Sequence, residues 1–126
     1  MGMKRILIID DEKEMVDLLQ MRLEAADYEI LVAYDSQEGL DKARAEKPDL
    51  ILLDIMMPKM NGYQVCRELK IDDGTKGIPV VMLTAKAQES DKFWGTEVGA
   101  DAYVTKPFEA SELLEKIRGF LESTQK

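Results

Sequence analysis

Short apolar runs alternate along the chain with longer stretches in which apolar residues recur every three or four positions. The run at residues 50–53 has the length and composition of a strand buried on both faces, as in a parallel sheet. Asp54 follows it directly, and Pro58 and Asn61-Gly62 then turn the chain away from the sheet. Open α/β sheets bind ligands at the carboxyl ends of their strands, so Asp54 is a candidate site residue. Aspartate also favours turns and caps, and this residue alone does not decide between the two interpretations.

Further apolar runs predict the other strands of the sheet. They lie at residues 5–9, 28–33, 78–83 and 101–105. Apolar residues at helical spacing predict a helix after each strand. We expect these helices at about residues 15–25, 36–47, 62–70, 88–98 and 110–121. Ser36 is the expected N-cap of the second helix, which Pro48 ends. In the first helix, the apolar residues at helical spacing are Met15, Leu18, Leu19 and Leu23.

The regular alternation of strand and helix predicts the fold class. Short connections between five strands and five helices are typical of an α/β protein with a doubly wound parallel sheet and helices on both faces. A chain of 126 residues is long enough for one domain with a real core, and we find no internal repeat or linker within residues 1–126. We expect the core to cover about residues 4–121 and residues 122–126 to form a frayed tail.

Composition narrows the range of possible functions. No apolar run is long enough to span a membrane and no signal peptide is visible, so we expect a cytoplasmic protein with no membrane partner. The net charge of -8 argues against nucleic-acid binding by this chain. The absence of histidine removes the commonest general base and the usual transition-metal ligand. The single cysteine, Cys66, lies at helical spacing and is expected to be a small buried residue.

Polar side chains with reactive or charged groups follow four of the predicted strands. Asp10 and Asp11 follow the first strand, Asp54 the third, Thr84 the fourth and Lys106 the fifth. Because the ends of parallel strands lie on one edge of a sheet, these side chains are expected to converge. Three carboxylates close together oppose each other's ionisation, which argues against a purely structural role for the whole set.

A divalent cation would relieve the repulsion among these carboxylates. Oxygen ligands without histidine or cysteine indicate Mg²⁺, which prefers to share a phosphoryl ligand with a few carboxylates. A metal ion and the Lys106 ammonium would neutralise charge on a transferring phosphoryl group, and Thr84 could hydrogen-bond one of its oxygens. Asp54 would then be the nucleophile and would form an acyl phosphate.

The motifs at these strand ends carry a resemblance to a known family. They are Asp10-Asp11, Asp54 within Leu-Leu-Asp-Ile-Met-Met-Pro, Leu83-Thr84-Ala85, and Gly99-Ala100-Asp101 through Tyr103 to Lys106-Pro107-Phe108. Each motif is weak alone, but all of them in this order are specific. The chain resembles a receiver domain of the two-component response-regulator family from residue 4 to about residue 121. The resemblance implies a flavodoxin-like fold with strand order 2-1-3-4-5.

The resemblance also implies a role for each site residue. Asp54 is the expected phosphoacceptor. Asp11 and Asp54 would ligate Mg²⁺ directly, Asp10 would act largely through water, and the backbone carbonyl of Met56 would complete the protein ligands. Lys106 would pair with the phosphoryl group.

Four residues are expected to govern the response to phosphorylation. Thr84 and Tyr103 would form a switch pair, in which the hydroxyl moves toward the phosphate and the ring turns inward. Met56 and Lys86 occupy positions that modulate hydrolysis in the family. Because a methionine side chain offers no strong hydrogen bond to an attacking water, we expect slower self-dephosphorylation than in family members with an amide or an acid at the position of Met56.

Partners outside this chain are implied as well. The chain has no histidine, so the phosphoryl group would come from a sensor histidine kinase or a histidine phosphotransfer protein. The chain would catalyse only its own phosphorylation and dephosphorylation. An unidentified output protein would bind the surface formed by the fourth helix, fifth strand and fifth helix. The sequence does not separate a stand-alone regulator from a receiver within a longer protein.

Two alternatives stay open at this point. A degenerate receiver would bind partners without phosphorylation, although the intact set of Asp10, Asp11, Asp54, Thr84 and Lys106 argues against it. An aspartate-nucleophile phosphohydrolase would also carry an acid after its first strand, but the chain lacks a convincing second acid in the expected pattern and a cap domain. A flavin-binding protein is less consistent still, because no phosphate-cradling loop follows the first strand.

Overall fold

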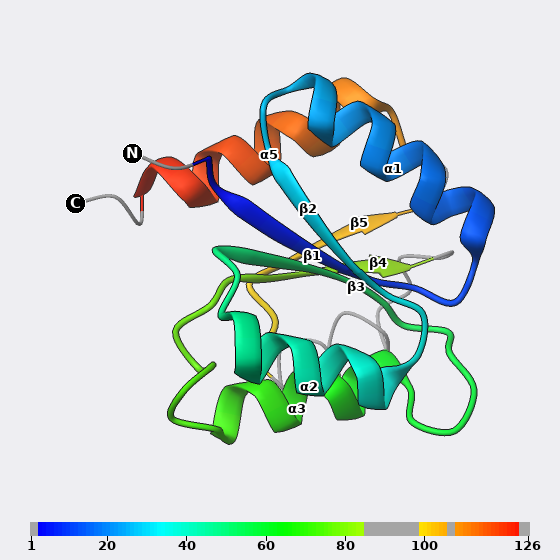
Figure 1. Ribbon diagram of the computed structural model, residues 1–126, viewed down its shortest axis with the longest axis vertical. Coiled ribbons are helices and arrows are strands. Elements are labelled where there is room, and N and C mark those ends of the chain that lie inside the picture. Colours follow the sequence, from blue (N-terminus) through cyan, green and yellow to red (C-terminus); the bar gives the residue numbers. More distant parts are fainter. Residues whose placement is uncertain (1–2, 85–98, 106–107, 124–126) are drawn as a thin grey trace.

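The fold is organised around one parallel sheet. A computed structural model describes residues 3–84, 99–105 and 108–123 (Figure 1). Its strands are β1 (Arg5–Ile9), β2 (Glu29–Ala33), β3 (Leu50–Asp54), β4 (Val80–Thr84) and β5 (Ala102–Thr105). They are ordered β2-β1-β3-β4-β5, and every neighbouring pair is parallel. The predicted fold class and strand order are therefore confirmed.

Helices cover both faces of this sheet. The described helices are α1 (Lys13–Ala25), α2 (Ser36–Glu46), α3 (Gly62–Ile71) and α5 (Ala110–Ser123). Figure 1 shows α1 and α5 on one face and α2 and α3 on the other. The helix expected at residues 88–98 lies outside the described residues. α5 continues to Ser123, past the residue at which we expected the core to end.

Alternating residues of the central strands supply a separate core to each helical layer. In β1, Leu7 and Ile9 belong to the cluster that packs against α2 and α3, whereas Ile6 and Ile8 belong to the cluster under α1 and α5. Every residue of β3 is buried, as expected of a strand covered on both faces. The apolar run at residues 50–53 is therefore explained by burial on two sides.

Two details of the helices differ from the sequence-based expectations. Asp35, not Ser36, is the N-cap of α2, because its carboxylate accepts a hydrogen bond from the Glu38 N–H at 2.8 Å. Ser36 is instead the first residue of the helix and is buried. In α1, Leu18 is 44% exposed, and Val16 takes the buried position next to Leu19.

Strand starts also shift by one or two residues relative to the apolar runs. The N–H of Tyr28 donates to the carbonyl of Leu23 at the end of α1, so Tyr28 belongs to the helix terminus and β2 begins one residue later. Among the described residues, no helix combines the length and apolar character needed to cross a membrane.

Candidate functional site

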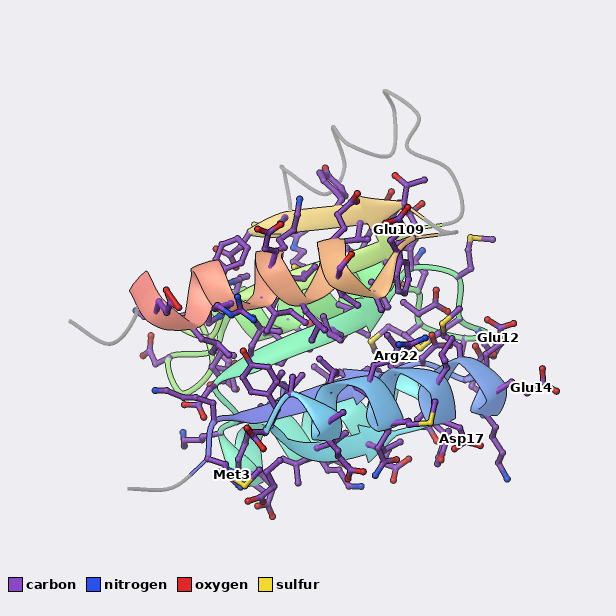
Figure 2. The ribbon with its side chains drawn as sticks, turned by 90° about the horizontal axis from the view of Figure 1, so that it is seen from above. Met3, Glu12, Glu14, Asp17, Arg22 and Glu109 are labelled. Carbon is purple, nitrogen blue, oxygen red and sulfur yellow. The ribbon has the colours of Figure 1, made fainter. Side chains whose placement is uncertain are left out.

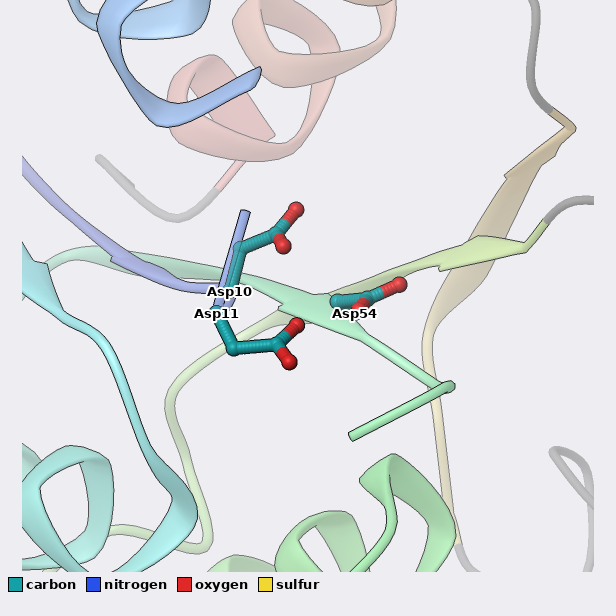
Figure 3. A group of neighbouring side chains, drawn as sticks. All are labelled: Asp10, Asp11 and Asp54. Carbon is teal, nitrogen blue, oxygen red and sulfur yellow. The ribbon is translucent and has the colours of Figure 1, made fainter. Parts of the chain in front are cut away.

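Three aspartates meet at the carboxyl ends of the two central strands. Asp54 is the last residue of β3, and Asp10 and Asp11 directly follow β1. The register of these neighbouring strands pairs Ile9 with Leu53, and the residue after each of them, Asp10 or Asp54, is an acid. One carboxylate oxygen from each aspartate lies within 4.8 Å of the other two, and Figure 3 shows the side chains together at this edge. The predicted convergence of these three residues is thus present in the structure.

Burial divides the three carboxylates into two kinds. Asp10 and Asp54 are buried, whereas Asp11 is exposed. The Asp10 side chain accepts a hydrogen bond from the backbone N–H of Glu12 at 3.0 Å, just before α1 begins. Its own N–H donates to the carbonyl of Ala33 at 3.1 Å, which ties this residue to β2. The cluster therefore presents one accessible carboxylate and two that the sheet holds in place.

Three more acids follow Asp10 and Asp11 closely in the sequence, at and just before the start of α1. Glu12, Glu14 and Asp17 are exposed at the start of this helix, as Figure 2 shows. At 4.8 Å, two unit charges repel by about 0.9 kcal/mol in water and by about 3.5 kcal/mol at an effective dielectric constant of 20. The helix N-terminus offsets part of this repulsion for Asp10, because its N–H groups carry partial positive charge. The remaining excess of negative charge favours a bound cation.

The donor set fits Mg²⁺. All three side-chain donors are carboxylate oxygens, which hard divalent cations prefer. Ligands bound directly to Mg²⁺ at about 2.1 Å lie no more than about 4.2 Å apart, so a spread of up to 4.8 Å requires only a small adjustment or one bridging water. Asp10, the most enclosed of the three, is the natural candidate for contact through water.

Met56 lies in the loop that follows β3. Its side chain is 72% exposed, two residues after Asp54. The loop begins at Ile55, whose N–H donates to the Leu83 carbonyl of β4 at 3.2 Å. The backbone of Met56 is therefore close in sequence to a fixed strand end, while its side chain is open to solvent.

Thr84 and Tyr103 lie on the other side of Asp54, in β4 and β5. Asp54 pairs with Leu83, which places Thr84 at the same edge of the sheet, where it is buried. Tyr103 pairs with Met82 and packs, partly buried, against the cluster beneath α2 and α3. Because side chains two residues apart share a face of a strand, Thr84 is on the same face as Met82 and Tyr103. Lys86 and Lys106 lie outside the described residues.

The structure adds two residues that the sequence did not single out as part of the site. The hydroxyl of Ser36 donates a hydrogen bond to the carbonyl of Met60, in the loop after β3. Gly62, the first residue of α3, is packed against the backbone of Asp54 and Ile55. The Asn61-Gly62 pair did indicate a turn, but nothing local indicated what the glycine contacts.

Comparison with known proteins connects this geometry to a family. The family model of the response regulator receiver domain matches residues 6–118. The chain belongs to the response regulator receiver domain family. The resemblance seen in the sequence is thereby confirmed, and this receiver domain is a phosphoacceptor module of two-component signal transduction.

Curated relatives and a solved structure agree with this assignment. The receiver domain is 45% identical over 122 residues to the alkaline phosphatase synthesis transcriptional regulatory protein PhoP of Bacillus subtilis, covering 97% of this chain and 50% of the relative. It is 46% identical over 124 residues to the DNA-binding dual master transcriptional regulator RpaA of Synechocystis, covering 98% of this chain and 52% of the relative. The chain thus spans about half the length of these relatives.

The solved structure is that of a response regulator receiver domain protein (CheY-like) from Methanospirillum hungatei. It has a TM-score of 0.91 and 34% identity, and the match covers 97% of this chain and 96% of that one. The backbone similarity therefore extends over nearly the whole receiver domain.

Proposed function

We propose that Asp54 is the residue that accepts the phosphoryl group, in a Mg²⁺-dependent reaction. The observation that carries this proposal is the position of Asp54: it ends the central strand of the sheet, with carboxylate oxygens of Asp10 and Asp11 within 4.8 Å. A nucleophile in this place lies at the edge where open α/β sheets bind their ligands, with a cluster of cation ligands beside it.

The proposed ligands differ in how they bind the cation. Asp11 and Asp54 bind it directly, Asp10 binds it largely through water, and the backbone carbonyl of Met56 completes the protein ligands. A bound Mg²⁺ supplies positive charge to the oxygens of the transferring phosphoryl group. Asp11, as the exposed member, would be the ligand most accessible to an ion from solvent.

The transfer itself needs one bond made and one broken. A carboxylate oxygen of Asp54 attacks phosphorus while the phosphorus–nitrogen bond of a phosphohistidine on the donor breaks. The products are an acyl phosphate on Asp54 and an imidazole on the donor. The donor is a sensor histidine kinase or a histidine phosphotransfer protein, since this chain has no histidine of its own. Lys106 pairs with the transferred phosphoryl group, and the chain catalyses only its own phosphorylation and dephosphorylation.

The acyl phosphate would act on Thr84 and Tyr103. The Thr84 hydroxyl moves toward the phosphoryl oxygens, and the Tyr103 ring turns inward on the same face of the sheet. This changes the surface that the family resemblance assigns to output binding, of which β5 and α5 are the described parts, and an output protein binds there. Met56 and Lys86 adjust how long the acyl phosphate survives.

The names of two relatives point to the kind of output that the receiver domain controls. Two relatives of about twice this length are named as transcriptional regulators, and one as DNA-binding. We infer that the receiver domain controls an output of this general kind, either attached or as a separate protein, and that it works in the cytoplasm. The chain's net charge of -8 argues that nucleic acid is bound by that output and not by the receiver domain.

One experiment tests the proposal against both alternatives. The protein is incubated with Mg²⁺ and acetyl phosphate, and its intact mass is measured beside that of Asp54→Ala. We expect a single added phosphoryl group in the unaltered protein and none in the variant. Repeated release of phosphate from small esters would instead indicate a phosphohydrolase, and an unchanged mass would indicate a degenerate receiver.

A further inference from the structure

The loop that follows Asp54 is held more firmly than its exposed position suggests. Residues 55–61 connect β3 to α3. The carbonyl of Ile55 accepts two backbone hydrogen bonds, from Met57 at 3.2 Å and from Gly62 at 2.9 Å. The N–H of Ile55 is tied to β4 through the Leu83 carbonyl. The beginning of the loop is therefore anchored to both a strand and the first residue of a helix.

Gly62 is in contact with the backbone of the proposed phosphoacceptor. A Cβ built on this residue would lie 2.5 Å from the carbonyl oxygen of Asp54 and 2.6 Å from the Cα of Ile55. Cβ atoms essentially never approach other atoms this closely, and a backbone cannot rotate away as a side chain does. Any side chain at this position must displace the end of β3 or the start of α3. The glycine is required here by close approach and not by an unusual φ.

Ser36 holds the other end of the same loop. Its side chain is buried on the first turn of α2, and its hydroxyl donates to the carbonyl of Met60, 24 residues away. α2 is already capped by Asp35, so this hydroxyl is not needed to begin the helix. Its hydrogen bond links the loop to a helix that the sheet holds in place.

We propose that Gly62 and Ser36 are positioning residues of the acidic site. Gly62 allows α3 to seat against Asp54, and Ser36 fixes the loop that carries the Met56 carbonyl. Together they fix the positions of two proposed Mg²⁺ ligands, the Asp54 carboxylate and the Met56 carbonyl, in the absence of the ion. This inference rests on the proposed function, because it concerns how the site is prepared for its cation. Ligand orientation by neighbouring groups typically changes metal affinity by about 10- to 100-fold.

The test is a calorimetric titration of the full chain with MgCl₂. We expect Gly62→Ala to raise the Kd for Mg²⁺ by about 10- to 100-fold. We expect Ser36→Ala to raise it by about 2- to 10-fold, the range expected for one lost hydrogen bond. In the acetyl phosphate assay, the Mg²⁺ concentration for half-maximal phosphorylation should rise by the same factors, while the rate at saturating Mg²⁺ should largely recover in Ser36→Ala.

Two control variants separate positioning from general destabilisation. Gly77→Ala adds the same methyl group where no atom lies within 4 Å, so its Kd should equal that of the unaltered protein. Ile117→Val removes a methylene from the buried side of α5 and lowers the Tm without touching the loop. A merely structural role for Gly62 and Ser36 would lower their Tm as Ile117→Val does and leave the Kd of the folded protein unchanged.

The outcomes distinguish this inference from the function on which it rests. If the unaltered protein binds Mg²⁺ and is phosphorylated, but Gly62→Ala and Ser36→Ala match it, only the positioning inference is wrong. If the unaltered protein neither binds Mg²⁺ nor is phosphorylated, the proposed function fails and the inference fails with it. Should Gly62→Ala not fold, as its circular dichroism would reveal, the Kd of Ser36→Ala decides the matter alone.

Discussion

Removing the charge of Asp54 should stabilise the Mg²⁺-free protein. The substitution Asp54→Asn keeps the size and planar shape of the side chain but removes one of three carboxylates that lie within 4.8 Å of one another. The native site would therefore hold a charge cluster that costs folding free energy and is tolerated because it binds a cation. Stability and function then oppose each other at one residue.

The expected magnitude follows from the burial of each partner. Asp10 is buried, so its repulsion with Asp54 is close to the value at an effective dielectric constant of 20, about 3.5 kcal/mol. Asp11 is exposed, so its repulsion is close to the value in water, about 0.9 kcal/mol. The N-terminus of α1 relieves part of this total, and we expect a net gain of about 2 kcal/mol, or about 8 °C in Tm.

The assay is thermal unfolding at pH 8 in EDTA and again in excess Mg²⁺. In EDTA, Asp54→Asn should melt above the unaltered protein. Mg²⁺ at 100 times its Kd should stabilise only the unaltered protein, by about 2.7 kcal/mol, so the gap should close. Asp73→Asn is the matched control, because Asp73 is fully open to solvent apart from its ion pair with Lys76, and its Tm should change little in either buffer.

A lower Tm for Asp54→Asn in EDTA would refute the reasoning. It would mean that attractive interactions of the Asp54 carboxylate outweigh its repulsion with Asp10 and Asp11. The acidic cluster would then be a stabilising network, and its need for a cation would lose its physical basis.

Four further predictions concern single residues. Met56→Asn should shorten the lifetime of the acyl phosphate, measured as loss of the added mass over time, because the amide can hydrogen-bond an attacking water; an unchanged lifetime would exclude a role for this side chain. Lys59 has a φ of 69°, in the left-handed region, so Lys59→Gly should raise the free energy of unfolding by about 1 kcal/mol in urea titrations. A lower free energy of unfolding in the variant would contradict the claim that the backbone is strained at this residue. Burial raises the pKa of the Cys66 thiol to about 11, so iodoacetamide at pH 8 should label it only after unfolding, and labelling of the native protein would disprove its burial. A hydrogen bond from the Gly74 N–H lowers the pKa of Asp72 below its ordinary value of 3.8. The stabilisation from this carboxylate is present above the pKa of the unfolded state and is lost as the pH falls through the lower pKa of the folded state. Asp72→Asn should therefore lower the Tm at pH 7, and the difference in Tm should vanish below pH 3.8; a difference that persisted there would contradict the electrostatic cause.

The sheet could be predicted from sequence because its central strands are buried on both faces. A continuous apolar run as short as residues 50–53, bounded by turn-forming residues, is typical of a buried strand, and Asp54 marks where that strand ends. The buried face of a helix could not be predicted as closely. Leu18 and Leu19 are adjacent, so helical spacing alone allows either to face inward, and only the packing of α1 on the sheet decides that Leu19 is buried.

Contacts between distant segments could not be predicted in the same way. Lys70 at the end of α3 donates hydrogen bonds to the Ile78 carbonyl and, at 2.9 Å, to Asp101, 31 residues away. The hydrogen bond from Ser36 to Met60 and the approach of Gly62 to Asp54 are of the same kind. Each depends on which helix lies beside which strand, and no local pattern of residues carries that information.

Topology explains why the three acids meet at one edge of the sheet. The strand order β2-β1-β3 means that the chain winds in opposite directions from β1 and from β3. It therefore leaves β1 toward α1 on one face and leaves β3 toward α3 on the other, as Figure 1 shows. The two connections diverge at the carboxyl ends of these strands, the place where open α/β sheets are expected to bind ligands. Asp10 and Asp11 follow β1 and Asp54 ends β3, so the reversal that sends the chain to opposite faces leaves the three carboxylates close together between the two connections.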